Sequence, residues 1–222
     1  MELVQRLDTL KAYCKGKRVL HLGCTNSPYT QSSIDNGSIL HFEIEKVASE
    51  VYGLDFDRES IDILTARGSK NIYYADLEHL EDLDLNETFD VILAGEMIEH
   101  LNNPGLFLNG IQRFMNPETE LVITTLNAYY GMRFIRYGFT RGQGENEPVH
   151  PDHVAYYSYS TLHVLIERHN LDVGKFLFYD LGKEHRSTTP FVFRAINDIC
   201  VWITPRWADG VIAVCRLRPS EV

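Results

Sequence analysis

Four stretches of this 222-residue sequence end in residues suited to binding a nucleoside. The apolar run VLHL ends at Gly23, where the missing Cβ lets a ligand approach the backbone. VYGLD ends in Asp55, whose carboxylate can accept two hydrogen bonds from a ribose diol. NIYYA is followed directly by Asp76, and FDVILA is followed by Gly95 and Glu96. Together these residues indicate a site that recognises a nucleoside through backbone groups and carboxylates.

The segments around these residues alternate between short apolar runs and helical patterns, which is typical of an α/β protein with a parallel sheet. Strands are predicted at 18–22, 51–55, 71–75, 89–94, 120–125, 172–179 and 210–217. Helices are predicted at 2–14, 38–48, 58–67, 104–114 and 159–169. The pattern at 191–203 fits either an amphipathic helix or part of a lid.

Three residues are suited to helix starts. Asp57 suits the N-cap of the helix at 58, Pro104 suits a first helical turn, and Ser160 is the expected cap of 159–169. In an open parallel sheet, ligands bind outside the carboxyl ends of the strands, where the strand order reverses. We therefore expect the four stretches to meet at one edge of the sheet.

The first motifs, in their order, resemble those of the class I S-adenosylmethionine-dependent methyltransferases, specifically the small-molecule enzymes with a methyltransferase type 11 domain. VLHLGCTNS at 19–27 is similar to the family's first motif, V-L-D-L-G-C-G-x-G. The strand that ends in Gly53 and Asp55 matches the second motif, G-x-D, and Asp76 matches the acid after the third strand.

Two later motifs extend the resemblance over residues 17–170. FDVILAGEMIEHL at 89–101 is similar to the family's fourth motif, F-D-x-(apolar)3-x-E-x-(apolar)-E-H. HVAYYSYSTLHVLI at 153–166 is similar to the family's aromatic-Ser helix entry after the fifth strand. Each motif is weakly specific by itself, and their shared order and spacing make the resemblance strong.

The resemblance implies an α/β, Rossmann-like, doubly wound and mostly parallel seven-stranded sheet, with helices on both faces and an antiparallel last strand. It also implies a single methyltransferase domain over 1–222. Its expected parts are an N-terminal helix (1–16), a cofactor-binding core (17–126), an acceptor loop or cap (127–157) and a C-terminal helix with the closing strands (158–222).

The same resemblance gives each matching residue an expected role in binding S-adenosylmethionine, with S-adenosylhomocysteine as the product. Gly23 is expected against the methionine part, beside backbone groups of Cys24 and Thr25. Asp55 is expected to bind both ribose hydroxyls, with Phe56 beside the adenine.

The remaining cofactor residues follow the third and fourth strands of the family motifs. Asp76 is expected to accept a hydrogen bond from the adenine amino group, with Leu77 packed on the ring. Gly95 and Glu96 are expected to line the floor beneath the sulfonium.

The sequence departs from the family pattern in the first motif. His21 stands where the family has an acid that commonly reaches the amino group of the cofactor, and Thr25 and Ser27 replace two glycines. Glu43 or Glu45, in a predicted helix, is a candidate replacement for that charge, and the alternative is that both lie on a solvated helix face.

Residues 127–157 are too long for a simple connection and rich in aromatic residues, which favours a functional segment that selects the acceptor. A hydroxyl acceptor must lose a proton as it attacks, so a general base is needed there. His150 and His153 are the candidates, and His100 is a weaker one, since with Glu99 it is expected to organise its loop.

Other residues near this segment have two interpretations. His150, Asp152 and His153 are metal-ligand types that lie close together, but no further ligand is identifiable from the sequence, so no metal site is predicted. Four tyrosines suit either an acceptor pocket or the core: Tyr129, Tyr130, Tyr156 and Tyr157. Three arginines suit either an acidic acceptor or a solvated face: Arg133, Arg136 and Arg141.

Composition narrows the class of protein. The formal net charge of −10 argues against nucleic acid as a partner, because phosphate binding needs clustered Lys and Arg. No apolar stretch approaches the roughly 20 residues that span a bilayer, and the N-terminal segment does not resemble a signal peptide. The four cysteines are far apart and are expected to be reduced thiols. We expect a cytoplasmic protein.

The leading hypothesis is a methyltransferase that acts on a small molecule or a glycan precursor, with O-methylation as the expected reaction. A nicotinamide-dependent oxidoreductase is an alternative, but it is expected to carry G-x-G-x-x-G after the first strand. A non-catalytic protein that has lost the cofactor is a second alternative, supported by the altered first motif. The sequence allows a homodimer but does not determine the oligomeric state, the acceptor or the methylated atom.

Overall fold

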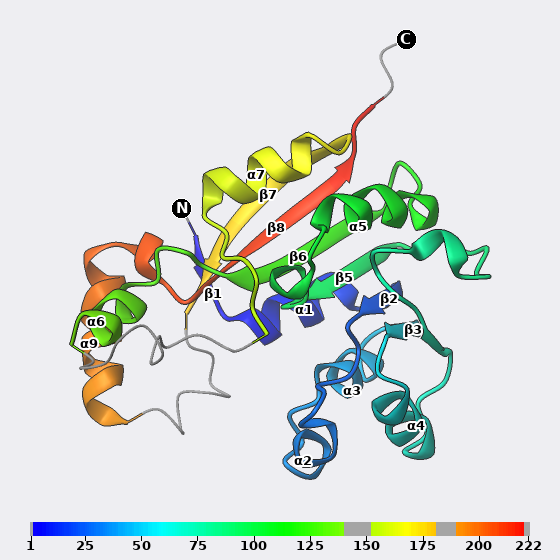
Figure 1. The fold of residues 1–222 in the computed structure, drawn as a ribbon, viewed down its shortest axis with the longest axis horizontal. Helices are drawn as coiled ribbons and strands as arrows, with labels where there is room; N and C mark the ends of the chain where they lie inside the picture. The colour runs from blue at the N-terminus through cyan, green and yellow to red at the C-terminus, as the bar shows by residue number, and fades with distance from the viewer. Residues whose placement is uncertain (1, 140–151, 181–189, 220–222) are drawn as a thin grey trace.

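A computed structural model of the chain describes residues 2–139, 152–180 and 190–219, which form an α/β fold (Figure 1). One eight-stranded sheet has the order β1-β7-β8-β6-β5-β2-β3-β4. The strands are β1 (Leu3–Val4), β2 (Arg18–Leu22), β3 (Glu50–Asp55), β4 (Ile72–Tyr74), β5 (Val91–Gly95), β6 (Glu120–Leu126), β7 (Leu171–Tyr179) and β8 (Gly210–Leu217). β8 is antiparallel to both of its neighbours, and the other pairs are parallel. The predicted mostly parallel sheet with an antiparallel last strand is confirmed, but it has eight strands rather than the predicted seven, because β1 adds to its edge.

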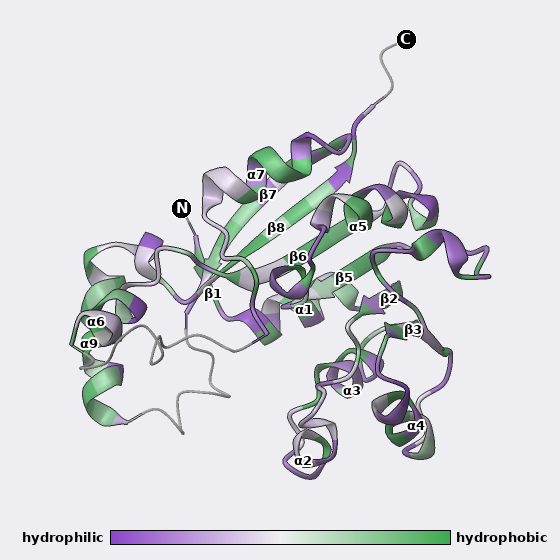
Figure 2. Ribbon diagram, in the orientation of Figure 1, coloured by the Kyte–Doolittle hydropathy of each residue, from purple (hydrophilic) through white to green (hydrophobic). Residues whose placement is uncertain are grey.

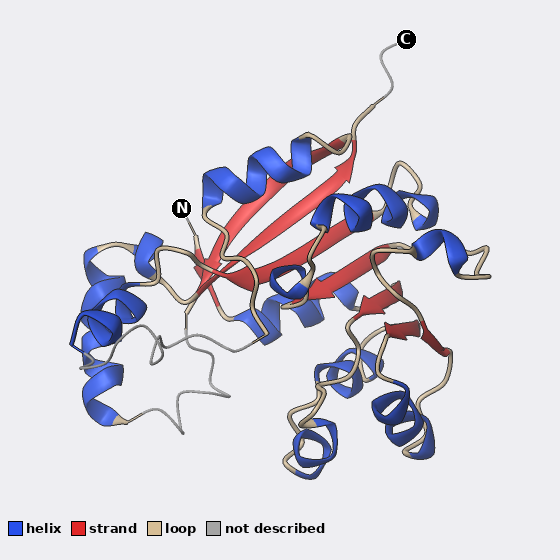
Figure 3. Cartoon of the chain, in the orientation of Figure 1, coloured by secondary structure: helices blue, strands red, loops and turns tan. Residues whose placement is uncertain are grey.

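Helices pack on both faces of this sheet (Figure 3). The helices of the described residues are α1 (Arg6–Cys14), α2 (Thr30–Asp35), α3 (Leu40–Glu45), α4 (Arg58–Ala66), α5 (Pro104–Gly110), α6 (Gly131–Phe139), α7 (Tyr159–Glu167) and α9 (Phe191–Ile203). Short 3-10 turns include η2 (Ile98–His100) and η3 (Ile111–Phe114). In the part of the chain that the structure describes, no helix is long and apolar enough to cross a membrane.

The core has two layers because successive side chains of a strand point to opposite faces. In β2, Val19 packs in one buried cluster with residues of α1 and α3. Leu20 and Leu22 pack in the other cluster, with residues of α5 and α7. Strands buried on both faces read as continuous apolar runs, which is why RVLHL and VILAG were recognisable in the sequence.

Local capping confirms two predicted helix starts and corrects one. The Asp57 side chain accepts a hydrogen bond from the Glu59 amide, and Pro104 lies in the first turn of α5. The cap of α7 is Ser158 rather than the predicted Ser160, because the helix already begins at Tyr159 and Ser158 forms a capping box.

The N-terminal prediction of one helix over 2–14 is wrong at its first residues. Leu3 and Val4 form the short strand β1, which pairs in parallel with Phe178 and Tyr179 at the end of β7. The helix therefore begins only at Arg6. The short helix α2 was also not predicted, because its sequence TQSSID has no apolar periodicity.

The segments 127–157 and 191–203, predicted separately, supply two helices that pack against each other. α6 lies in the first segment, and α9 covers the whole of the second. A Cβ added at Gly131 would lie 3.2 Å from the Cys200 Sγ, so a small residue allows this close approach. Both helices carry apolar residues beyond the edge of the sheet (Figure 2).

Gly210 is required where β8 passes the ring of Tyr179, because an added Cβ would overlap ring atoms of this buried side chain. We expect Gly210→Ala to lower the free energy of unfolding by about 2 kcal/mol or more, since overpacking displaces the ring. Gly174→Ala in β7 is the matched control, because its Cβ would approach nothing closer than 3.8 Å. Urea unfolding of both variants measures the difference, and equal stabilities contradict the prediction.

Candidate functional site

The fold places the predicted strand ends side by side. Leu22 of β2 pairs with Leu54 on one side and with Ala94 on the other, so the residues that follow these three lie in one row. β2 is also where the strand order reverses, since β3 and β4 lie to one side of it and β5 and β6 to the other. This is the position at which doubly wound sheets bind ligands.

Gly23 turns the chain at the end of β2. Its φ of +62° is in the left-handed region, and an added Cβ would lie 3.3 Å from the Met97 Cβ. The next residue, Cys24, is buried, and its amide donates to the Leu54 carbonyl at 3.2 Å. The loop therefore crosses the end of β3 instead of continuing along β2.

The carboxylate of Asp55 holds this loop in place. One oxygen accepts from the Thr25 amide and the Thr25 hydroxyl, both at 2.9 Å. The other accepts from the amides of Phe56 and Asp57 at 2.8 and 3.1 Å. These four donors fill the accepting positions of a carboxylate. Asp55 thus has a structural role that sequence reasoning missed, and its contact with a ribose stays a prediction.

The residues predicted for the adenine lie next along the row. Phe56 is 72% exposed, so its ring is available to a ligand. Asp76 is exposed, and one of its oxygens accepts from the Glu78 amide at 2.9 Å. Leu77 belongs to the core, with 9% of its surface exposed. Their roles toward adenine stay predictions.

His21, which replaces the family's acid, stacks on a second histidine. The rings of His21 and His41 are parallel within 9°, and their Nδ1 atoms lie 3.1 Å apart. Both side chains are buried. The Nε2 of His41 lies 3.4 Å from a carboxylate oxygen of Glu45, whereas Glu43 pairs with Lys11 and Lys46. Of the two candidate glutamates, only Glu45 lies next to the histidine pair.

These contacts favour one set of tautomers. A His41 that carries its proton on Nε2, toward Glu45, accepts at Nδ1 from His21. The Nε2 of His21 is then an acceptor, and it lies 3.9 Å from the position of a Cβ on Gly95. Burial lowers the pKa of His21 well below its ordinary range, and His41 and Arg6 lower it further. A neutral His21 therefore presents a lone pair beside the end of β5.

A network that no sequence motif indicates surrounds the end of β5. The Tyr179 hydroxyl donates to the Glu96 carboxylate at 2.6 Å, and the Arg6 guanidinium lies 3.4 Å from its other oxygen. Glu96 itself has a φ of +54°, an uncommon conformation for a side-chain-bearing residue. Arg6 also lies over Gly95, where it is 3.5 Å from the position of a Cβ. No motif marked Arg6 or Tyr179, because they reach the site from positions far apart in the sequence.

The fourth motif continues into η2, where it meets the predicted acceptor segment. Glu99 is buried, and the Thr125 hydroxyl donates to its carboxylate at 2.9 Å. Burial, followed by the neighbouring Glu96, raises the pKa of Glu99 to about 7. The rings of His100 and His153 meet edge to face with centroids 4.6 Å apart. The structure thus brings two candidate bases together, while the third, His150, lies outside the described residues.

The aromatic residues of the acceptor segment divide between core and surface. Tyr157 is buried in the core, whereas Tyr129 is 60% exposed. The Arg133 guanidinium lies 4.2 Å from the centre of the Tyr156 ring and donates to the Asn127 carbonyl. This arginine is therefore built into the segment rather than solvated. The side chain of Arg136 and the whole of Arg141 lie outside the described residues.

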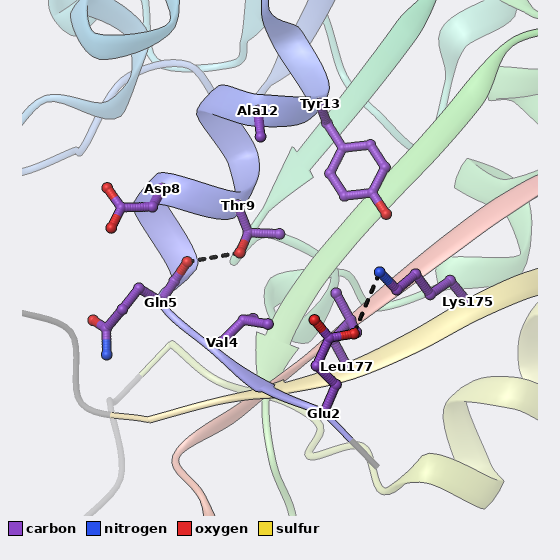
Figure 4. A pocket seen from close by; sticks show the side chains of 9 residues that line it. All are labelled: Glu2, Val4, Gln5, Asp8, Thr9, Ala12, Tyr13, Lys175 and Leu177. Atoms are coloured by element: carbon purple, nitrogen blue, oxygen red, sulfur yellow. Dashed lines mark hydrogen bonds and ion pairs between the residues drawn. The ribbon is translucent and has the colours of Figure 1, made fainter.

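A separate groove of about 600 Å³ lies between α1 and the edge formed by β1 and β7 (Figure 4). Its lining residues include Asp8, Tyr13 and Lys175, the last of which pairs with Glu2 across the groove. None of the residues at the strand ends lines it. This groove does not belong to the predicted site.

The family of methyltransferase domains matches residues 2–175 of this chain. The chain belongs to the methyltransferase domain family. Among curated proteins, it is similar to the ubiquinone biosynthesis O-methyltransferase of Bradyrhizobium diazoefficiens, with 26% identity over 164 residues. That match covers 69% of this chain and 60% of the relative, so the chain spans less than two thirds of the relative's length.

Solved structures support the fold. A SAM-dependent methyltransferase from Archaeoglobus fulgidus has a TM-score of 0.58 at 20% identity, covering 95% of this chain and 91% of that one. One from Mesorhizobium loti has a TM-score of 0.56 at 16% identity, covering 95% of both chains. The chain therefore has the Rossmann-like fold of the S-adenosylmethionine-dependent methyltransferases, as predicted.

Removal of the Asp55 carboxylate tests its structural role. We expect Asp55→Ala to lower the free energy of unfolding by about 3 kcal/mol, because the amides and the hydroxyl that donate to the carboxylate lose their charged acceptor. Thr25→Val removes only the hydroxyl bond and is expected to cost about 1 kcal/mol. Urea unfolding measures both. If Asp55→Ala is as stable as the parent chain, the carboxylate does not hold the loop.

The buried neutral His21 predicts a pH dependence of stability. Below about pH 6.5 the unfolded chain takes up a proton on this imidazole that the folded chain does not, because burial lowers the folded pKa. Stability from this group is therefore lost as the pH falls, by up to about 1.4 kcal/mol per pH unit. In His21→Gln that loss is absent, so the stability difference from the parent narrows at low pH. Urea unfolding between about pH 5.5 and 8 tests this, and a constant difference contradicts it.

Proposed function

We propose that this chain is an S-adenosylmethionine-dependent methyltransferase that transfers a methyl group to an oxygen of a small-molecule acceptor. The row of strand ends at β4, β3, β2 and β5 carries the proposal, because it occurs at the reversal point of a methyltransferase-family sheet. The ubiquinone biosynthesis O-methyltransferase named among the relatives supports both oxygen and a small molecule.

The residues at the strand ends fit the cofactor part by part. When bound, S-adenosylmethionine supplies a methyl group already activated on sulfur. The backbone of Gly23, Cys24 and Thr25 would face its methionine part. On the nucleoside side, Asp55 would meet the ribose once Thr25 yields a position, and the exposed ring of Phe56 would cover the adenine.

The methionine part has two further partners near the end of β5. The Nε2 lone pair of His21 suits an ammonium group, and the Arg6 guanidinium, which also lies over Gly95, suits a carboxylate. An amino acid carries both groups, so this pair of side chains matches it at both ends. A neutral acceptor here takes over the place of the family's acid without adding another negative charge beside Glu96.

On the acceptor side, α6 and α9 cover the end of the sheet beyond β6 and β7 (Figure 1). Methyl transfer needs in-line alignment and exclusion of water more than covalent help from protein. The acceptor hydroxyl must still lose its proton, and His100 and His153 are the candidate bases among the described residues. Sugar and phenol hydroxyls are the two acceptor classes to screen. A glycan precursor as acceptor, a homodimer and a cytoplasmic location stay predictions.

Calorimetric titration with S-adenosylmethionine tests the proposed cofactor. We expect saturable binding by the parent chain, weakened about 10-fold or more in His21→Ala, because a hydrogen bond to a charged group is lost. His21→Asp is the matched variant, since it restores the family's acid and is expected to retain binding. No binding at high micromolar cofactor overturns the proposed function. If the cofactor binds, transfer of labelled methyl groups to a phenol or a sugar identifies the acceptor class.

A further inference from the structure

A cluster of metal-ligand side chains lies beyond the end of β5, next to the row of strand ends. Glu99, His100 and His153 each offer one oxygen or nitrogen atom, and these atoms all lie within 4.8 Å of one another. Two of the residues belong to η2, and the third comes from the start of the segment that leads to α7. The missing further ligands for His153 are thus supplied by a distant part of the sequence.

Backbone hydrogen bonds hold the two segments together. The Glu99 carbonyl accepts from the amides of Val154 and Ala155, at 2.9 and 3.3 Å. This double contact fixes the chain directly after His153 against the residue that precedes His100. The juxtaposition is therefore a property of the backbone and does not depend on chance side-chain rotamers.

The carboxylate of Glu99 is also oriented from behind. Its side chain is buried, and the Thr125 hydroxyl of β6 donates to one of its oxygens at 2.9 Å. Carboxylates that bind metals are commonly held in this way by a second hydrogen bond, which fixes their orientation. The two imidazoles differ in exposure, since His153 is half-buried and His100 is exposed, so the cluster opens toward solvent on the His100 side.

The spacing suits a small cation. Bonds from such an ion to imidazole nitrogen and carboxylate oxygen are about 2.0–2.2 Å, so ligand atoms lie at most about 4.4 Å apart across it. The upper limit of 4.8 Å in this cluster exceeds that only slightly. The spacing of the three side chains is therefore close to that of ligands around a small cation.

We propose that Glu99, His100 and His153 bind a divalent first-row transition-metal cation, such as Zn²⁺, and leave a coordination position open. Two imidazoles and one carboxylate favour such ions over Mg²⁺ and Ca²⁺, which prefer oxygen ligands. Three protein ligands with an open position are typical of catalytic rather than structural sites.

The role of this cation rests on the proposed function. An acceptor hydroxyl bound at the open position has a lowered pKa, so its proton passes to water and the oxygen becomes the nucleophile. The new carbon–oxygen bond then forms as the carbon–sulfur bond of the donor breaks, with no change of oxidation state. In this arrangement His100 and His153 are ligands, and the cation replaces a general base.

Metal titration of the chelator-stripped full chain tests the site directly. We expect one Zn²⁺ per chain by calorimetry, and Co²⁺ in its place should give the absorption bands of a nitrogen- and oxygen-coordinated ion. His100→Ala and His153→Ala should each weaken Zn²⁺ binding about 100-fold or more, since even partners outside the ligand set cost 10- to 100-fold. The matched control is His163→Ala on α7, a histidine that also faces a glutamate, Glu167, at 3.2 Å. It should bind Zn²⁺ like the parent.

The possible results separate this site from the proposed function. No stoichiometric Zn²⁺ binding, or equal binding by the His100→Ala/His153→Ala double variant, overturns the metal site even if S-adenosylmethionine binds and methyl transfer proceeds. Zn²⁺ binding that is lost in the two histidine variants supports the site even if the chain binds no S-adenosylmethionine, which is the failure of the proposed function. With both in place, a chelator is expected to abolish methyl transfer and leave cofactor binding unchanged.

Discussion

The parallel pairing of β2 with β3 on one side and β5 on the other is the constraint on which the rest of this structure depends. Parallel strands all end at the same edge, so one register decides which residues share it. Leu22 pairs with both Leu54 and Ala94, and this aligns the glycine turn at Gly23, the buried carboxylate of Asp55 and the last residue of β5. A shift by one residue would turn every side chain of β2 to the opposite face and break both core layers.

At the same edge, backbone amides that follow the strands need hydrogen-bond acceptors outside the sheet, and Asp55 supplies such acceptors. Its carboxylate accepts from three amides and one hydroxyl, so the loop after β2 is held by a charged acceptor. Buried polar groups are costly unless hydrogen-bonded, which explains why a carboxylate is tolerated at 8% exposure. The sequence alone therefore does not distinguish a carboxylate that binds a ligand from one that stabilises the fold.

Local patterns predicted most of the sheet and the helices, because buried strands and amphipathic helices repeat over a few residues. The range of α9 and the cap at Asp57 are examples. The strand β1 was predicted as helix because its formation depends on a distant partner. It forms only where β7 offers an edge to Leu3 and Val4.

The candidate site also divides into residues that local motifs predict and residues that only tertiary packing brings together. Its strand ends were readable from motifs, since each lies next to an apolar run. The link of Arg6 to Glu96 joins residues far apart in sequence, as does the meeting of His100 with His153. Nothing local in the sequence marks such pairs, because tertiary packing alone brings them together.

The density of carboxylates at this edge gives a physical reason for the unusual His21. Burial, followed by Glu96, raises the pKa of Asp209 to about 7, and the same two causes raise that of Glu99. Arg6 is the guanidinium that lies against Glu96. A further acid at the end of β2 would add to this repulsion, whereas a neutral imidazole keeps the hydrogen-bond acceptor and omits the charge. An edge of this kind favours positively charged ligands, which is the property that a sulfonium cofactor and a bound cation have in common.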